Sequence, residues 1–149
     1  MRPGALLLDL DGTIFQGHAL IPGALETLLF LQNAKIPYRF ITNATRMTKK
    51  KLVLMLGDMG LSVSLDDIFS APHAAAIYCQ NKGYKKILLA VPDREMEADF
   101  SNFQLVDNNP DAIVLGDMGA GFTFNLINDL FNHILGGAEL VAMHKNRFW

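Results

Sequence analysis

The feature that most constrains the fold is a short apolar segment that stops abruptly at an acidic residue. Residues 5–8 are continuously apolar, and Asp9 follows them directly. A run of this length without polar alternation is typical of a strand covered on both faces in a parallel sheet. The run is too short to be a signal sequence or a membrane-spanning helix. The chain is therefore expected to be an α/β protein.

Apolar spacing predicts that helices alternate with strands in the first half of the chain. Helical spacing covers residues 23–32 and 48–56, and extended segments cover residues 38–42 and 68–70. This β-α-β-α-β order favours parallel strands joined by right-handed crossovers. We predict a three-layer, doubly wound parallel sheet.

The second half of the chain repeats this alternation. A helix is predicted over residues 72–81 and strands over residues 86–90, 104–106, 112–115 and 140–143. The clearest helix covers residues 123–135, where a broad apolar stripe ends at Gly136. A basic tail runs from His144 to Arg147. A weak domain boundary lies between residues 70 and 85, where the alternation restarts.

The composition of the chain limits which partners and which cellular compartment are expected. The 149 residues include 13 basic and 15 acidic side chains, and neither sign forms a long block. We therefore expect no nucleic-acid or membrane partner, and a small molecule as ligand. Cys79 is the only cysteine, which excludes an internal disulfide and favours a cytoplasmic location. Its apolar surroundings indicate a small buried side chain and not a catalytic thiol.

Asp9 and Asp11 are the strongest candidates for chemistry. They flank Leu10 directly after a predicted strand, so both side chains should project on one side at the carboxyl edge of the sheet. Gly12 permits a sharp exit from the strand, and Thr13 can hydrogen-bond within the loop. Parallel α/β sheets bind their ligands at this edge.

Two other interpretations of this loop compete with a catalytic one. A calcium loop of the EF-hand type would need an oxygen ligand, a glycine and a glutamate at positions that here hold Thr13, Ile14 and Leu20. That mode is excluded. A strand that ends in a simple polar turn is the structural alternative, because Asp-Gly is a common turn sequence.

The sequence DLDGT at residues 9–13 resembles the first signature of the haloacid dehalogenase superfamily. This resemblance implies that Asp9 is a nucleophile that forms an aspartyl phosphate and that Asp11 is the general acid and base. It also implies a Mg²⁺ cofactor bound by the Asp9 carboxylate and the Asp11 backbone carbonyl. An acid at the second position favours a phosphatase over a dehalogenase or a transport ATPase.

Thr42 and Asn43 resemble the second signature, which is a strand that ends in Ser or Thr. By this resemblance, Thr42 binds the transferring phosphoryl group through its hydroxyl and backbone N–H, and Asn43 is the asparagine typical of NagD-like phosphatases. A strand followed by an ordinary Thr-Asn turn is the structural alternative.

The resemblance extends over nearly the whole chain and follows the order of subfamily IIA, the NagD-like group. It is closest to the branch that contains phospholysine phosphohistidine inorganic pyrophosphate phosphatase. Residues 1–71 are then the N-terminal part of a partial core, and residues 72–149 are an inserted α/β cap. The lysine of the third signature and the metal-binding aspartates of the fourth are absent from this sequence. Lys145 belongs to the cap by position.

The favoured function is a Mg²⁺-dependent phosphohydrolase that acts on a small phosphorylated metabolite. Because two signatures are absent, the alternative is a truncated, catalytically silent protein with a binding or regulatory role, and we expect little turnover from this polypeptide alone. The sequence leaves the substrate and the oligomeric state open, a homo-oligomer included.

Two sequence features receive no catalytic role. Arg46 and residues 49–51 form a basic cluster, which we interpret as a solvated charged face. The sequence GDMG occurs at residues 57–60 and again at residues 116–119. The flanks of the two copies differ, so we interpret the repetition as coincidence.

Overall fold

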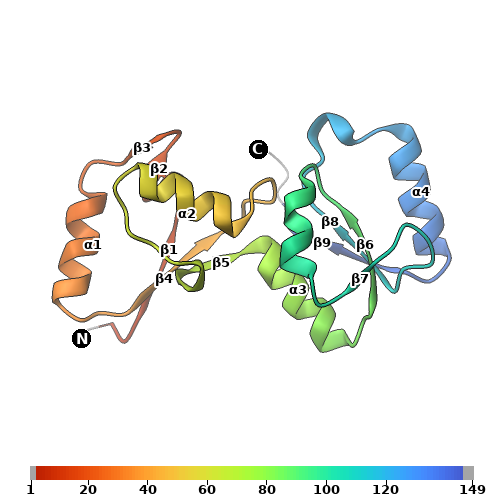
Figure 1. Ribbon diagram of the computed structural model, residues 1–149, viewed down its shortest axis with the longest axis horizontal. Helices are drawn as coiled ribbons and strands as arrows, with labels where there is room; N and C mark the ends of the chain where they lie inside the picture. The colour runs from red at the N-terminus through yellow and green to blue at the C-terminus, as the bar shows by residue number, and fades with distance from the viewer. Residues whose placement is uncertain (1–2, 146–149) are drawn as a thin grey trace. The chain divides into compact units, whose positions relative to one another are not determined.

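The computed structural model describes residues 3–145, so Asn146 and Arg147 of the predicted basic tail lie outside the described residues. The chain divides into two compact units (Figure 1). The first unit comprises the residues up to Thr42 together with Lys49–Ser70. The second unit comprises Asn43–Thr48 and the residues from Ala71 onward.

The first unit is built on a parallel sheet with the strand order β1-β4-β5. Its elements are β1 (Leu6–Asp9), β2 (Phe15–Gln16), β3 (Ala19–Leu20), α1 (Ala24–Asn33), β4 (Tyr38–Thr42), α2 (Lys49–Asp58), the 3₁₀ turn η1 (Leu65–Asp67) and β5 (Ile68–Ser70). The connections from β1 to β4 and from β4 to β5 both run in the same direction across the sheet. Right-handed connections therefore place α1 and α2 on the same face. Their apolar residues cover that face.

Burial alternates along these strands as the covered face requires. Phe40 and Ile68 are buried, as is Leu10 directly after β1. The opposite face is open in the described residues: Leu7 is 69% exposed and Phe69 is 44% exposed. β1 also lies at an edge of the sheet, because it pairs only with β4 among the described strands.

The second unit has helical elements on both faces of a four-stranded parallel sheet with the order β7-β6-β8-β9. Its elements are α3 (Ala71–Lys82), β6 (Lys86–Ala90), the 3₁₀ segment η2 (Arg94–Phe100), β7 (Gln104–Leu105), β8 (Ala112–Leu115), the short turn η3 (Gly119–Gly121), α4 (Phe124–Leu135) and β9 (Glu139–Ala142). Side chains alternate along β8, so Ala112 and Val114 face one apolar layer and Ile113 faces the other.

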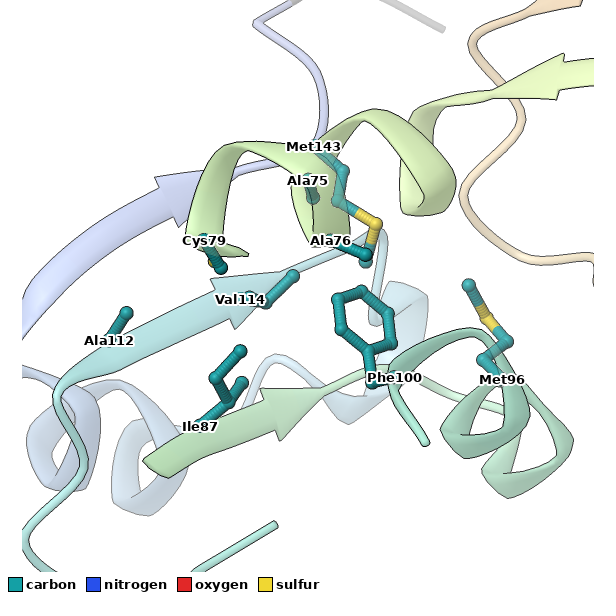
Figure 2. Packing of buried hydrophobic residues seen from close by; sticks show 9 residues of the cluster. All are labelled: Ala75, Ala76, Cys79, Ile87, Met96, Phe100, Ala112, Val114 and Met143. Atoms are coloured by element: carbon teal, nitrogen blue, oxygen red, sulfur yellow. The ribbon is translucent and has the colours of Figure 1, made fainter. Parts of the chain in front are cut away.

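Figure 2 shows the larger of these two layers, where side chains from α3, η2, β6 and β8 converge. Phe100, Met96, Cys79 and Ile87 are fully buried there. Leu130 of α4 packs with Ile113 and Ala90 on the other face. The second unit therefore has a three-layer α/β/α arrangement of its own.

The predicted α/β fold class is confirmed, since the three-stranded and four-stranded sheets are both parallel and their strands alternate with helices. The predicted helices and strands lie within a few residues of those observed. The β2-β3 hairpin and η2 were not among the elements predicted from the sequence. Among residues 3–145, no helix has both the length and the apolar character needed to span a bilayer.

Glu139 at the start of β9 joins two tyrosines of the second unit. Its carboxylate accepts hydrogen bonds from the hydroxyls of Tyr78 and Tyr84, and Lys82 lies 3.9 Å away. These hydrogen bonds lower the pKa of Glu139. The bond to Glu139 raises the pKa of Tyr84 from 10.0 to about 12, because ionised Tyr84 would lose its donor and face a carboxylate.

We expect Tyr84 to ionise late in an alkaline titration followed by ultraviolet absorbance. The pKa of Tyr84 is raised on folding, so the hydrogen bond to Glu139 stabilises the fold fully below pH 10.0. This stabilisation is lost as the pH rises through about 12. Glu139→Ala should move this ionisation toward that of an ordinary tyrosine. Ionisation of Tyr84 near pH 10.0 in the unsubstituted protein would contradict the prediction.

Candidate active site

Asp9 and Asp11 lie on the same side of the segment that leaves β1. Both residues are exposed, whereas Leu10 between them is 0% exposed and anchors the segment in the core. The Leu10 N–H donates to Asp9 Oδ1 at 2.9 Å. The alternation expected from the sequence is therefore present, with both carboxylates directed away from the apolar interior.

The loop after Leu10 is held by its own backbone. The Leu10 carbonyl accepts hydrogen bonds from the N–H groups of Thr13, Ile14 and Phe15 at 3.3, 2.8 and 3.2 Å. The Gly12 N–H donates to the Phe15 carbonyl at 2.8 Å, and Gly12 has a φ of 76°. That left-handed conformation favours glycine, which explains the residue at this point. The loop fixes the backbone that carries Asp11.

Thr42 lies at the same edge of the first unit's sheet as Asp9. Asp9 is paired in register with Ile41, so Thr42 is one residue further along the neighbouring strand. Adjacent strands are about 4.8 Å apart, which brings the two strand ends close together. Alternation directs the Thr42 side chain toward the covered face, and Thr42 is buried. The structure therefore unites Asp9, Asp11 and Thr42 at one edge without placing their side chains on one face.

Asn43 follows Thr42 by one peptide bond but belongs to the second unit. Its side chain is exposed. It lines a cavity of about 240 Å³ in that unit, together with Arg46, Asp117 and His144. Asn43 is therefore available to a ligand, and its backbone is continuous with the end of β4.

The oxygen donors of this loop are of the type that Mg²⁺ prefers. Mg²⁺ favours carboxylate and carbonyl oxygen ligands and retains several waters. Asp9 and Asp11 satisfy this chemistry. Among residues 3–145, however, no group of three or more His, Cys, Asp or Glu side chains is arranged to hold a metal ion. The described residues therefore fit a partial magnesium site.

The basic cluster at the start of α2 is partly the predicted solvated face, since Arg46 and Lys50 are exposed, but two of its side chains also make contacts within the protein. Lys49 Nζ donates to the carbonyls of Leu65 and Ile68 at 3.2 and 3.4 Å. Arg46 Nε lies 2.7 Å from Asp117 Oδ2. Long flexible side chains can reach such distant acceptors, which spacing along the sequence does not reveal. At least two of these cations are therefore engaged in structural contacts.

Residues 6–105 match the family model described as haloacid dehalogenase-like hydrolase. Human haloacid dehalogenase-like hydrolase domain-containing protein 2 is 37% identical over 145 residues, which cover 97% of this chain and 54% of that protein. Bovine phospholysine phosphohistidine inorganic pyrophosphate phosphatase is 27% identical over 150 residues, with the same two coverages. The chain thus spans about half the length of the curated relatives it matches.

Solved structures support the same assignment. 4-Nitrophenylphosphatase from Thermotoga maritima superposes with a TM-score of 0.87 and 25% identity, over 96% of this chain and 55% of that one. NagD from Escherichia coli superposes with a TM-score of 0.85 and 20% identity, over 99% of this chain and 60% of NagD. This likeness supports the fold. The chain belongs to the haloacid dehalogenase-like hydrolase family. The relatives and the solved structures at 25% identity, which include a putative NagD protein with a TM-score of 0.86, support the NagD-like subfamily IIA.

Proposed function

We propose that this chain provides the nucleophile loop of a Mg²⁺-dependent phosphohydrolase that acts on a small phosphorylated metabolite. The observation that carries the proposal is the pair of exposed carboxylates, Asp9 and Asp11, held on one side of a backbone-locked loop at the carboxyl edge of a parallel sheet. Similarity to a named phosphatase supports this choice of reaction.

The proposed reaction has two displacements at phosphorus. An Asp9 carboxylate oxygen attacks in line, the bond to the leaving oxygen breaks, and Asp11 gives its proton to that oxygen. Water then attacks the aspartyl phosphate while Asp11 takes up a proton, which releases phosphate and regenerates the Asp9 carboxylate. Thr42 and Asn43 bind the phosphoryl oxygens through their backbone N–H groups, since the buried Thr42 side chain is directed toward the covered face.

A bound Mg²⁺ would neutralise phosphoryl charge during both steps. Its ligands from this chain would be the Asp9 carboxylate and the Asp11 backbone carbonyl. We expect weak metal affinity from these groups alone, because the described residues offer no further acidic cluster.

The test is hydrolysis of p-nitrophenyl phosphate with and without Mg²⁺. The 149-residue chain should be assayed alone and as a fusion, called the joined protein, with the part of the bovine relative that follows its matched region. The bovine relative itself is the positive control. We expect slow turnover or none from the chain alone and Mg²⁺-dependent turnover from the joined protein. A folded joined protein without turnover would refute the proposal in favour of a catalytically silent protein.

Asp11→Asn should distinguish the acid from the nucleophile by its dependence on the leaving group. An asparagine cannot protonate the leaving oxygen, and this loss matters most for a poor leaving group such as an alkyl alcohol. We expect the hydrolysis rate of an alkyl phosphate to fall about 10²-fold or more, and that of p-nitrophenyl phosphate to fall less. Rate constants for both substrates measured with the joined protein provide the comparison. Equal losses would argue against Asp11 as the acid.

A further inference from the structure

The second GDMG sequence, residues 116–119, directly contacts the segment that follows Thr42. The Asp117 N–H donates to Thr45 Oγ1 at 3.1 Å, and Asp117 Oδ2 lies 2.7 Å from Arg46 Nε. The other carboxylate oxygen, Asp117 Oδ1, accepts from the Gly119 N–H at 2.8 Å. All of these groups belong to the second unit. One acidic residue therefore binds two neighbouring residues of Asn43–Thr48.

Both glycines of this copy make room for the same segment. A Cβ atom on Gly116 would lie 3.2 Å from the Thr45 carbonyl oxygen and 3.0 Å from Met143 Cε. A Cβ atom on Gly119 would lie 1.9 Å from Arg46 Nη2, so no side chain fits there while Arg46 keeps its position. Residues 116–119 thus form a seat for Asn43–Thr48.

The first copy of the sequence has no such role. A Cβ atom on Gly57 or Gly60 would meet nothing within 4 Å, and Asp58 is exposed. Gly60 and Gly119 both have positive φ angles, 89° and 50°. The chain therefore contains an internal control with the same residues and similar backbone strain but without the contacts.

The contacts of the seat offset the conformational entropy that a connecting segment loses when it is ordered. Fixing each backbone residue opposes folding, so a six-residue connection needs compensating contacts. Thr45 is buried, and the Asp117 carboxylate is 13% exposed although its partner Arg46 is 59% exposed. A partly buried pair is screened less than a surface pair.

We propose that Asp117 and Gly119 are positioning residues that hold Arg46 and thereby fix Asn43–Thr48, including Asn43. The proposal rests on the proposed function only in giving Asn43 a ligand-binding role. Asp117 acts through the segment, since its carboxylate is occupied by Arg46 and Gly119. Asn43 and Arg46 both line the adjoining cavity, so fixing the segment also fixes these two side chains around it.

The test is the backbone order of Asn43–Thr48 in the 149-residue chain, measured by ¹⁵N relaxation without any ligand. We expect order parameters near the rigid value of about 0.85 in the unsubstituted protein and below about 0.6 in Gly119→Ala and Asp117→Ala. Gly60→Ala and Asp58→Ala are the matched controls and should leave the segment rigid. An unchanged segment in Gly119→Ala and Asp117→Ala would overturn the proposal.

Arg46→Ala keeps the proposal testable if Gly119→Ala or Asp117→Ala does not fold. It removes the held side chain from an exposed position and should loosen the segment to the same extent. Adding Gly119→Ala to Arg46→Ala should loosen the segment no further, because the two changes remove one interaction. Additive effects would overturn the proposal.

Kinetics on the joined protein separate this proposal from the proposed function. If turnover is present, Asp117→Ala should lower kcat/KM at least fivefold and Asp58→Ala should not. Loosening of the segment without turnover in any form would refute the phosphohydrolase and leave the seat intact. Turnover with a segment that stays rigid in Asp117→Ala would refute the seat alone.

Discussion

Asp9→Asn is expected to reduce Mg²⁺-dependent hydrolysis by the joined protein by about 10³-fold or more. The amide keeps the size of the side chain but removes the negative charge and the nucleophilic oxygen. Asp9 is exposed, and the described contact that its carboxylate makes is with the Leu10 N–H next to it. The substitution should therefore leave the fold unchanged, and steady-state rates with p-nitrophenyl phosphate provide the measurement.

Asp66→Asn is the matched control for this experiment. Asp66 is also an exposed aspartate of the first unit, but it lies in η1, away from the carboxyl edge of the sheet. Its substitution should change the rate less than twofold. If Asp9→Asn retained the activity of the unsubstituted protein, Asp9 would not be the nucleophile, and the phosphohydrolase would need another attacking group.

Long periodic segments made most of the fold predictable. The apolar stripe predicted over residues 123–135 corresponds to α4 at Phe124–Leu135, and Gly136 follows it as expected. The β2-β3 hairpin escaped prediction because its strands have only two residues each, too few for periodicity. The segment η2 did carry a signal in the sequence, because the apolar residues Met96 and Phe100 are four residues apart and acidic residues flank them. Both side chains are buried in the structure.

The candidate site was predictable where its residues are close in sequence. Asp9 and Asp11 follow one apolar strand, and strand alternation alone placed them on one side of the loop. Thr42 could be placed at the same edge because parallel strands end together. Magnesium binding and the roles of these residues and of Asn43 follow from family resemblance, because alternation and burial do not specify which reaction a carboxylate performs.

The contact between Arg46 and Asp117 was not predictable in the same way. These residues are far apart in the sequence, and their pairing depends on where β8 ends relative to the segment Asn43–Thr48. The sequence groups Arg46 with the lysines at residues 49–51, and such a basic cluster favours a solvated charged face. The repeated GDMG was the available signal, but only the three-dimensional contacts show that the second copy lies against Arg46 and the first does not.

Phe100→Ala is expected to destabilise the second unit by about 3–5 kcal/mol. Phe100 is 0% exposed and packs with Ile87, Met96 and Val114 between η2 and the sheet (Figure 2). Removal of its ring leaves a cavity that the surrounding strands cannot fill without moving. The change is large against a typical domain stability of about 5–15 kcal/mol.

Because the chain has two compact units, the measurement for Phe100→Ala must report on each of them. Native-state hydrogen exchange of Lys86–Ala90 and Ala112–Leu115 follows the second unit, and exchange of Tyr38–Thr42 follows the first. Phe124→Ala is the matched control, since Phe124 is 83% exposed and should change stability by no more than about 0.5 kcal/mol. Equal effects of the two substitutions would contradict the packing in Figure 2, where Phe100 is the largest buried side chain of the layer.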